Sequence, residues 1–279
     1  MQKRKLGRSG ISIAPFVLGG NVFGWTADEA TSFALLDAYV GEGFDAIDTA
    51  DVYSRWVPGH AGGESEAVIG RWLAARGGRG RVMIATKVGM DMGEGGKGLR
   101  RAHIERSAEA SLKRLQTDYI DLYQSHADDA ETPLDETLAA YESLIKAGKV
   151  RAIGASNYDA GRLAEALSVS EARGLPRYDT LQPLYNLVER EAFEGALAKV
   201  SADNDVAVIP FFGLASGFLT GKYRSEADLA KSPRGQRVKG YLNPKGLAVL
   251  AALDAVAAEL SATPAQVALK WRPACKSVS

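Results

Sequence analysis

The sequence has a single cysteine, Cys275, no long hydrophobic run and no excess of either charge. One cysteine cannot form an internal disulfide, and the chain has no paired thiols to bind zinc. No apolar run approaches the roughly 20 residues that span a bilayer, and the N-terminus lacks the apolar core of a signal peptide. Because acidic and basic residues balance at 34 each, no global field attracts nucleic acid or an anionic membrane. We therefore expect a cytoplasmic protein without a metal, nucleic-acid or membrane partner.

The sequence does contain a regular alternation of short apolar runs and helical segments. A hairpin around Gly7–Gly10 is expected first. The expected strands are 16–20, 44–48, 82–87, 119–124, 150–156, 178–182 and 206–211. The expected helices are 28–40, 64–75, 101–115, 134–147, 159–172, 191–202, 246–260 and 264–271, with a long irregular, basic loop over 213–244. This alternation indicates βαβ units and a parallel α/β sheet.

Two observations favour a closed TIM-like (β/α)8 barrel over an open, doubly wound sheet. No strand leads into the Gly-x-Gly-x-x-Gly fingerprint of a dinucleotide-binding sheet. Polar side chains instead follow most of the expected strands, at Asn21, Asp48, Lys87, His126, Ser156, Asn157 and Gln182. In a barrel these strand ends converge on one rim, where active sites lie. Only seven of the eight strands are recognisable.

A buried strand runs directly into a polar loop at Asp45–Tyr53. Asp48 ends the apolar run, and a buried carboxylate needs a partner. The natural counter-ion is Lys87, which ends the next strand, and His126 follows the strand after that. We expect the positive charge to lower the pKa of the Tyr53 phenol from about 10. Tyr53 could then protonate a carbonyl, with the other three groups as its partners.

Two structural alternatives accompany this catalytic hypothesis. Asp48 and Lys87 could form an ion pair that only closes the barrel rim. Residues 126–129 combine one histidine with two aspartates, which also occurs at metal sites, but no second histidine ends a neighbouring strand. Four groups at matching strand ends favour catalysis over both alternatives.

Amide and hydroxyl groups end the fifth and sixth expected strands, at Ser156, Asn157 and Gln182. These groups suit a flat polar ligand that carries a carboxamide. Phe211 ends the seventh strand with an aromatic face suited to stacking. Ser156 and Asn157 could instead cap the helix that follows them. Capping is a weaker explanation for Gln182, which precedes Pro183.

Seven longer motifs carry further information. They are Phe44–Tyr53, Gly63–Gly70, Thr86–Lys87, Asp118–His126, Lys146–Asn157, Gln182–Arg190 and Gly217–Tyr223. Together they closely resemble the aldo-keto reductase superfamily, and the nearest branch is the bacterial one related to potassium-channel β subunits. The similarity runs from the N-terminal hairpin to about Trp271. It implies a barrel that binds extended NADP(H) without a Rossmann domain and acts on an aldehyde, ketone or sugar-like carbonyl.

The resemblance also implies roles for the matching residues. Catalysis rests on the four strand-end groups, with Tyr53 as general acid/base and the other three as its tuning and orienting partners. Phe211 stands where the family usually stacks a tyrosine. The residues implied in cofactor binding, from the carboxamide to the pyrophosphate, are Ser156, Asn157, Gln182, Phe211, Leu214, Ser216, Gly217, Lys222 and Arg234. Basic residues in this loop suit two phosphates.

The chain departs from the family pattern in two places. Phe212-Gly213 replaces the usual Ser-Pro, which removes a hydroxyl. After Trp271 the family continues with an eighth strand and a final helix that hold the adenosine 2′-phosphate, whereas this chain continues as 272–279 without a strand-like run. We expect one barrel domain over 1–279, C-terminally truncated relative to the family, with the eighth strand missing or replaced and two strands left as edges.

Aromatic residues on the first two rim loops, Phe23, Trp25 and Trp56, either form a substrate wall or pack the loops together. The leading hypothesis is an NADP(H)-dependent oxidoreductase, with NAD(H) still open. The alternatives are a cofactor-binding regulatory subunit with little turnover, as the channel β subunits suggest, and an inactive truncated reductase. No motif specifies the physiological substrate, the reaction direction or the oligomeric state.

Overall fold

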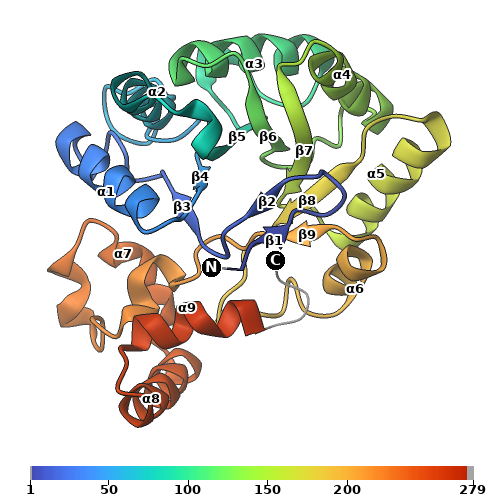
Figure 1. Cartoon of the computed structure of the whole chain (residues 1–279). Helices are drawn as coiled ribbons and strands as arrows, with labels where there is room; N and C mark the ends of the chain where they lie inside the picture. Colours follow the sequence, from blue (N-terminus) through green and yellow to red (C-terminus); the bar gives the residue numbers. More distant parts are fainter. Residues whose placement is uncertain (1, 275–279) are drawn as a thin grey trace.

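Seven parallel strands form one curved sheet in the computed structural model, which describes residues 2–274. The strands follow one another in chain order across the sheet (Figure 1). They are β3 (Val17–Gly19), β4 (Ala46–Asp48), β5 (Met83–Val88), β6 (Ile120–Ser125), β7 (Val150–Ser156), β8 (Tyr178–Gln182) and β9 (Ala207–Val208). The predicted barrel architecture is confirmed, as a half-barrel of seven parallel strands. Within residues 2–274 no eighth strand joins β9 to β3, so both remain edges of the sheet.

Six helices cover the outer face of this sheet (Figure 1). They are α1 (Glu29–Gly41), α2 (Glu64–Arg76), α3 (Arg101–Leu115), α4 (Leu134–Lys146), α5 (Ala160–Arg173) and α6 (Ala196–Asp203). The cap of α5 is Asp159, whose carboxylate accepts the Arg162 backbone N–H at 2.7 Å. The alternative role of Ser156 and Asn157 as caps of this helix is therefore wrong, and both side chains are available for another role.

The predicted N-terminal hairpin is present and closes the amino end of the half-barrel. It consists of β1 (Arg4–Lys5) and β2 (Ser12–Ile13), which pair antiparallel. Leu6 and Ile13 are buried among the inward-facing residues of the sheet. Gly7 has φ +55°, and an added Cβ would lie 2.3 Å from the Asp179 carbonyl oxygen. Only glycine allows the hairpin turn to approach β8 so closely.

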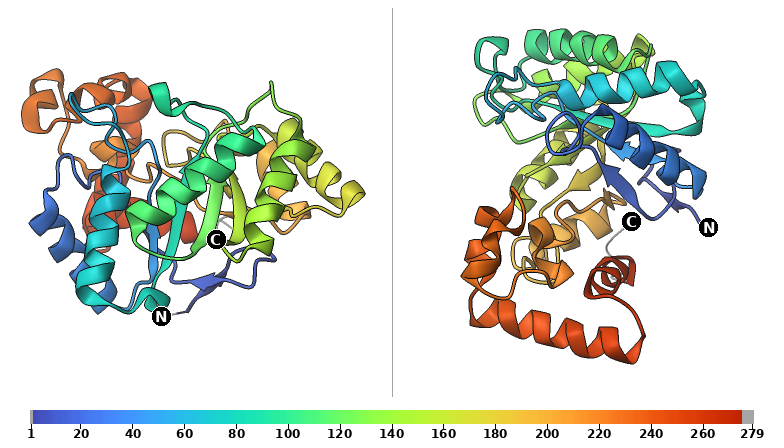
Figure 2. Two further views of the ribbon diagram at one scale, coloured as in Figure 1. Left: turned by 90° about the horizontal axis from the view of Figure 1, so that it is seen from above. Right: turned by 90° about the vertical axis from the view of Figure 1, so that its left-hand side faces the viewer.

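Residues 213–274 form a helical region on one side of the sheet (Figure 2). Its elements are η3 (Ala215–Thr220), η4 (Glu226–Lys231), α7 (Gly235–Val238), η5 (Lys239–Tyr241), α8 (Pro244–Glu259) and α9 (Pro264–Ala274). The expectation of an irregular loop over 213–244 was wrong, because four short helical segments occupy it. They bury an apolar cluster of their own that includes Phe218, Tyr223, Val238 and Leu250. This cluster is separate from the main core between the sheet and its helices.

Helix α9 lies beside the open side of the sheet, near β3 and β9 (Figure 1). Trp271 packs against Tyr185, with 5.3 Å between the ring centroids. The helix extends to Ala274, beyond its predicted end at Trp271. Cys275 lies outside the described residues. Across residues 2–274 no single helix is long and apolar enough to cross a membrane. Taken together, α8 and α9 have the length and composition of a membrane span, but the pair is bent by 100°.

Candidate active site

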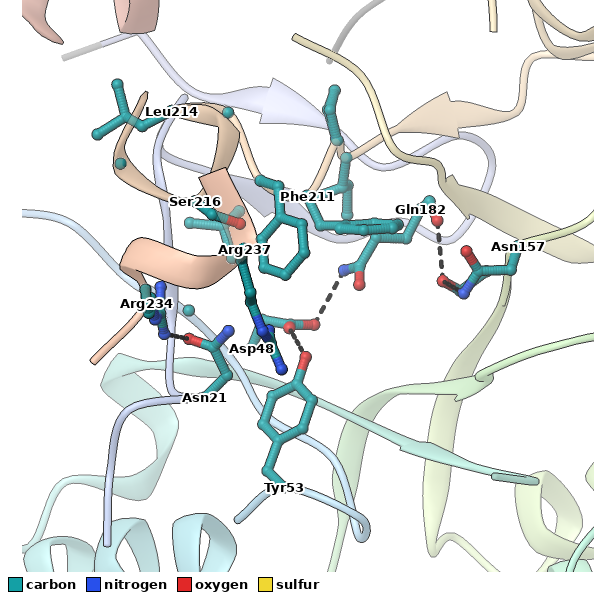
Figure 3. Close-up of a pocket in the computed structure, with 18 of the residues that line it drawn as sticks. Asn21, Asp48, Tyr53, Asn157, Gln182, Phe211, Leu214, Ser216, Arg234 and Arg237 are labelled. Atoms are coloured by element: carbon teal, nitrogen blue, oxygen red, sulfur yellow. Dashed lines mark hydrogen bonds between the residues drawn. The ribbon is translucent and has the colours of Figure 1, made fainter. Parts of the chain in front are cut away.

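A cavity of about 630 Å³ opens at the carboxyl end of the sheet, between the strands and the C-terminal helical region (Figure 3). One end is lined by the catalytic candidates Asp48, Tyr53 and His126, together with Asn157 and Gln182. The other end is lined by Leu214, Ser216, Gly217, Lys222 and Arg234. Phe211 lies between the two groups in Figure 3. The structure thus brings most of the predicted site residues to one cavity.

Asp48, Tyr53 and Lys87 form a compact hydrogen-bonded group at the catalytic end. The fully buried Lys87 ammonium donates to Asp48 Oδ2 at 2.6 Å and to the Tyr53 hydroxyl at 3.0 Å. It also donates to the Thr49 carbonyl at 2.8 Å. The Tyr53 hydroxyl lies 3.4 Å from the same Asp48 oxygen. All three donors of the ammonium are therefore used, and Lys87 holds the phenol at a fixed position.

The electrostatics keep Lys87 charged and Tyr53 neutral. Burial opposes the charge on Lys87, but Asp48 and Tyr53 outweigh it and raise the pKa of the ammonium. Burial raises the pKa of Tyr53 to about 12, although Lys87 acts in the opposite direction. The expected lowering of the Tyr53 pKa is therefore wrong, because desolvation and the Asp48 charge exceed the effect of Lys87. A neutral phenol is still the form that can donate a proton.

His126 faces Tyr53, with 5.9 Å between the ring centroids. Burial and the Lys87 charge lower its pKa to about 3, so the imidazole is neutral. Its Nδ1 is buried and has no hydrogen-bond partner among the described residues. A neutral imidazole beside a phenol is suited to hydrogen-bond a bound oxygen rather than to bind a carboxylate.

The amide side chains at the strand ends support the catalytic group. Gln182 donates to Asp48 Oδ1 at 2.9 Å, and Gln124 approaches the same atom at 3.4 Å. Ser156 donates to the Gln182 carbonyl at 2.8 Å, and Asn157 donates to the His126 carbonyl at 2.8 Å. Gln124 was missed from the sequence, although it lies near the end of β6, two residues before His126. Its position near the end of a predicted strand is the sequence signal that could have identified it.

Backbone strain is concentrated around the cavity. Five non-glycine residues in or next to its lining have positive φ: Ser54 at 75°, Asn157 at 55°, Phe212 at 51°, Ala215 at 48° and Ser216 at 57°. Such conformations cost free energy and persist where the surroundings impose them. Ser54 directly follows Tyr53, and its hydroxyl donates to the Phe23 carbonyl at 3.0 Å. The strained positions thus fix the loops that carry the candidate residues.

The opposite end of the cavity carries three cations, Lys222, Arg234 and Arg237. Within residues 2–274 none of them pairs with a carboxylate. Arg234 donates to Asn21 Oδ1 at 3.1 Å and lies 5.5 Å from the centre of the Trp25 ring. Burial and the neighbouring Arg237 charge lower the pKa of Arg234. Arg237 was missed from the sequence, although its position three residues after Arg234 would place both on one face of a helical turn.

The three aromatic candidates occupy different environments. Trp56 lines the cavity and is 41% exposed. Trp25 packs edge-on against it, with 5.5 Å between the ring centroids. Phe23 is fully buried in the main core, so its predicted substrate contact is replaced by a packing role. Of the three, only Trp56 lines the cavity, with Trp25 packed against it.

The cavity fits a dinucleotide cofactor in size and in chemistry. Its volume lies in the range of about 300–1,000 Å³ that is usual for ligand sites. It offers polar side chains beside Asp48 at one end and the three cations at the other. No group of three or more His, Cys, Asp and Glu side chains among residues 2–274 is placed to bind a metal ion.

Comparison with known proteins identifies the family. The Aldo/keto reductase family matches residues 15–275. The chain belongs to this family. It is 36% identical to "Uncharacterized oxidoreductase YrpG" of Bacillus subtilis, over 97% of this chain and 83% of that protein. It is 33% identical to "Protein tas" of Escherichia coli, over 97% and 85%. It is 31% identical to the "Probable voltage-gated potassium channel subunit beta" of Arabidopsis thaliana, over 100% and 85%. The aldo-keto reductase resemblance inferred from the motifs is confirmed.

Proposed function

We propose that this aldo-keto reductase transfers a hydride between NADP(H) and the carbonyl or alcohol carbon of a small aldehyde, ketone or sugar-like substrate. One observation carries the proposal: the Lys87 ammonium binds both the Asp48 carboxylate and the Tyr53 hydroxyl, at 2.6 and 3.0 Å. A buried lysine held between a carboxylate and a phenol at the mouth of a cavity is an arrangement suited to proton transfer.

In the reductive direction, Tyr53 donates the proton to the carbonyl oxygen. The chemistry that NADP(H) would supply, when held in this cavity, is the hydride for the carbonyl carbon. The neutral imidazole of His126 binds the same oxygen and orients it toward the phenol. As the proton leaves, the positive charge of Lys87 stabilises the phenolate, and Asp48 holds Lys87 in place. In the oxidative direction the same phenolate accepts the proton from the alcohol.

The remaining cavity residues are assigned to the cofactor. Ser156, Asn157 and Gln182 are assigned to the nicotinamide carboxamide, and Phe211 to stacking on the ring. The strained backbone from Leu214 to Gly217 and the side chains of Lys222 and Arg234 are assigned to the pyrophosphate, where charge-assisted hydrogen bonds are strong. We assign Arg237 to the same phosphate-binding group. Three cations at one end of the cavity suit the pyrophosphate, which NADP(H) and NAD(H) share, and the choice of NADP(H) rests on the family resemblance.

We also propose that residues 1–279 act as one domain, because both regions contribute to a single cavity. A regulatory subunit with little turnover is the second candidate. It is favoured by the similarity over the whole chain to a protein named as a channel subunit. Both functions need the cofactor, but only the reductase needs the proton donor.

The test is NADPH oxidation in the presence of nitrobenzaldehyde, by the wild type and by Tyr53→Phe. We expect the variant to lose at least about 100-fold in kcat, because loss of a general acid costs roughly 10²–10⁴. NADPH should still raise the Tm of both proteins, since binding to the native state stabilises it. A Tm increase without turnover in the wild type would favour the regulatory subunit. Absence of both would contradict either function.

A further inference from the structure

A second group of buried polar side chains lies behind the catalytic loop, between the sheet and helices α2 and α3. Its carboxylates are Asp51, 2% exposed, and Glu66, fully buried. The cation that faces them is Arg114 of α3, whose Nε donates to Glu66 Oε2 at 2.6 Å. Gly63, with φ +84°, leaves room for the Arg114 side chain, since an added Cβ would lie 2.4 Å from it. This group takes no part in the chemistry proposed above.

The charges in this group do not balance. Glu66 is fully engaged, because its second oxygen accepts the Thr86 hydroxyl at 2.5 Å. The other nearby cation, Lys87, is bound to Asp48. Asp51 therefore has no counter-ion of its own, and its Oδ1 has no hydrogen-bond partner among the described residues. A buried carboxylate in that situation is costly, and it takes up a proton instead.

The groups that face Asp51 act on its pKa in opposite directions, and burial and the Glu66 charge outweigh the two cations and the Val52 backbone N–H. Burial, followed by the Glu66 charge, raises the pKa of Asp51 to about 7, although Arg114 and Lys87 lower it. On β6, burial and the Asp51 charge raise the pKa of Tyr123 well above its ordinary value, so that phenol remains neutral. On α4, burial likewise raises the pKa of Tyr141, with a smaller contribution from the Asp51 charge. The pKa of Asp51, at about 7, lies inside the range in which the protein can be assayed.

Asp51 also lies in the backbone segment that places the catalytic groups. It stands between Asp48 and Tyr53, and its N–H donates to the Lys87 carbonyl at 3.3 Å. The next segment is fixed by the Ser54 hydroxyl at a strained φ of 75°. Any movement of Asp51 toward water would pull on Tyr53 directly.

We propose that Asp51 is a positioning residue of the reductase, which stays buried as a neutral carboxylic acid behind the loop of Tyr53 and so lets that loop keep its place beside the α2–α3 layer. When Asp51 ionises, an unpaired charge appears in this layer and the loop loosens. Turnover and stability then both fall as the pH rises through neutrality. The kinetic part of this inference rests on the proposed function, but the stability part does not.

The kinetic test compares the wild type with Asp51→Asn, which keeps the shape and stays neutral at every pH. The assay is NADPH with nitrobenzaldehyde from about pH 5.5 to 9. We expect similar kcat values at about pH 6 and a variant-to-wild-type ratio that rises severalfold by about pH 9, with little change in the ratio of KM values. Tyr53 and His126 cannot cause this change, because their pKa values of about 12 and about 3 lie outside the range. A pH-independent ratio would overturn the proposal.

The stability test needs no turnover. The pKa of Asp51 is higher in the folded than in the unfolded chain, so its contribution to stability is present at low pH and is lost as the pH rises toward about 7. The Tm of Asp51→Asn minus that of the wild type should therefore increase by about 2 °C or more between about pH 5 and 8. A constant difference would sink the inference, even in a protein without reductase activity.

The control is Asp37→Asn, an exposed carboxylate that binds Arg76 at 2.9 Å and has a lowered pKa. Asp37→Asn should alter neither the pH dependence of kcat nor the pH dependence of Tm. If Asp51→Asn does not fold, Asp51→Ser provides a smaller neutral side chain. Failure of both variants to fold would also contradict the proposal, because a neutral carboxyl should be replaceable by another neutral group.

Discussion

The two ends of the cavity are built in different ways. At the catalytic end, Asp48 is approached by four donors, from Tyr53, Lys87, Gln124 and Gln182, three of them on strands. At the basic end, three cations stand on loops and short helical segments and have no carboxylate partner within residues 2–274. The hydrogen bonds around Asp48 are made without a ligand, whereas the second end has charges that a ligand can neutralise.

Under the proposed function, this difference separates the residues for chemistry from those for binding. Fixed dipoles at the catalytic end need no reorganisation during the reaction, which is where electrostatic catalysis gains most. The basic end belongs to the helical region, which has an apolar cluster of its own. Because β3 and β9 do not pair with each other, the two ends are linked less directly here than in a closed barrel. Substitutions should therefore affect stability at one end and cofactor affinity at the other.

The largest effect is expected from Lys87→Met. Removing one partner of a buried ion pair leaves the other uncompensated, which costs about 3–5 kcal/mol. The free energy of unfolding, measured with urea, should fall by that amount, and turnover should be lost as well. The matched control is Lys149→Met, since Lys149 forms an exposed ion pair with Glu109. Exposed pairs contribute about 1 kcal/mol or less. Equal effects of the two substitutions would show that the catalytic group is not preorganised.

The sequence predicts the catalytic end well because its residues are tied to strand periodicity. Asp48, Lys87 and Gln182 each end an apolar run, and parallel strands bring such ends together. The contacts among these three side chains follow from the position of each at a strand end. The strand and helix order could be read for the same reason, since each apolar run and each amphipathic segment is a local signal.

The features that the sequence did not reveal depend on desolvation and on contacts between distant segments. The pKa of Tyr53 rises because burial exceeds the effect of Lys87, a balance that no motif encodes. Phe23 is expected on the rim but is buried in the main core, and the Ser54 hydroxyl of the next loop donates to its carbonyl. The short helical segments over 213–244 are rich in glycine and charge, and they form only because they pack on a shared cluster. The role of Arg237 depends on that packing.

A smaller effect is expected from Arg234→Gln at the basic end. Loss of one charge-assisted contact to a phosphate should raise the Kd for NADPH roughly 10- to 100-fold, since such hydrogen bonds contribute roughly 1.5–3 kcal/mol. The kcat at saturating cofactor and the urea midpoint should change little. Binding can be measured by the fluorescence of NADPH at several salt concentrations. The control is Arg224→Gln, because Arg224 already pairs with Asp254 at 2.7 Å. A fall in kcat with unchanged Kd would place Arg234 in the chemistry and contradict the separation.

The smallest effect is expected from Trp56→Ala, at the border between the two ends. Trp56 packs edge-on against Tyr53 and Trp25 and is the exposed aromatic surface of the cavity. Aromatic pairs contribute about 0.5–1.5 kcal/mol beyond area burial, so the KM for nitrobenzaldehyde should rise roughly 2- to 10-fold. The KM for a short aliphatic aldehyde should change less, because it has no ring to pack. Phe23→Leu provides the contrast: it should lower Tm and leave both KM values unchanged, since Phe23 lies in the core. An equal rise for the two aldehydes in Trp56→Ala would mean that this side chain shapes the loop rather than contacting the substrate.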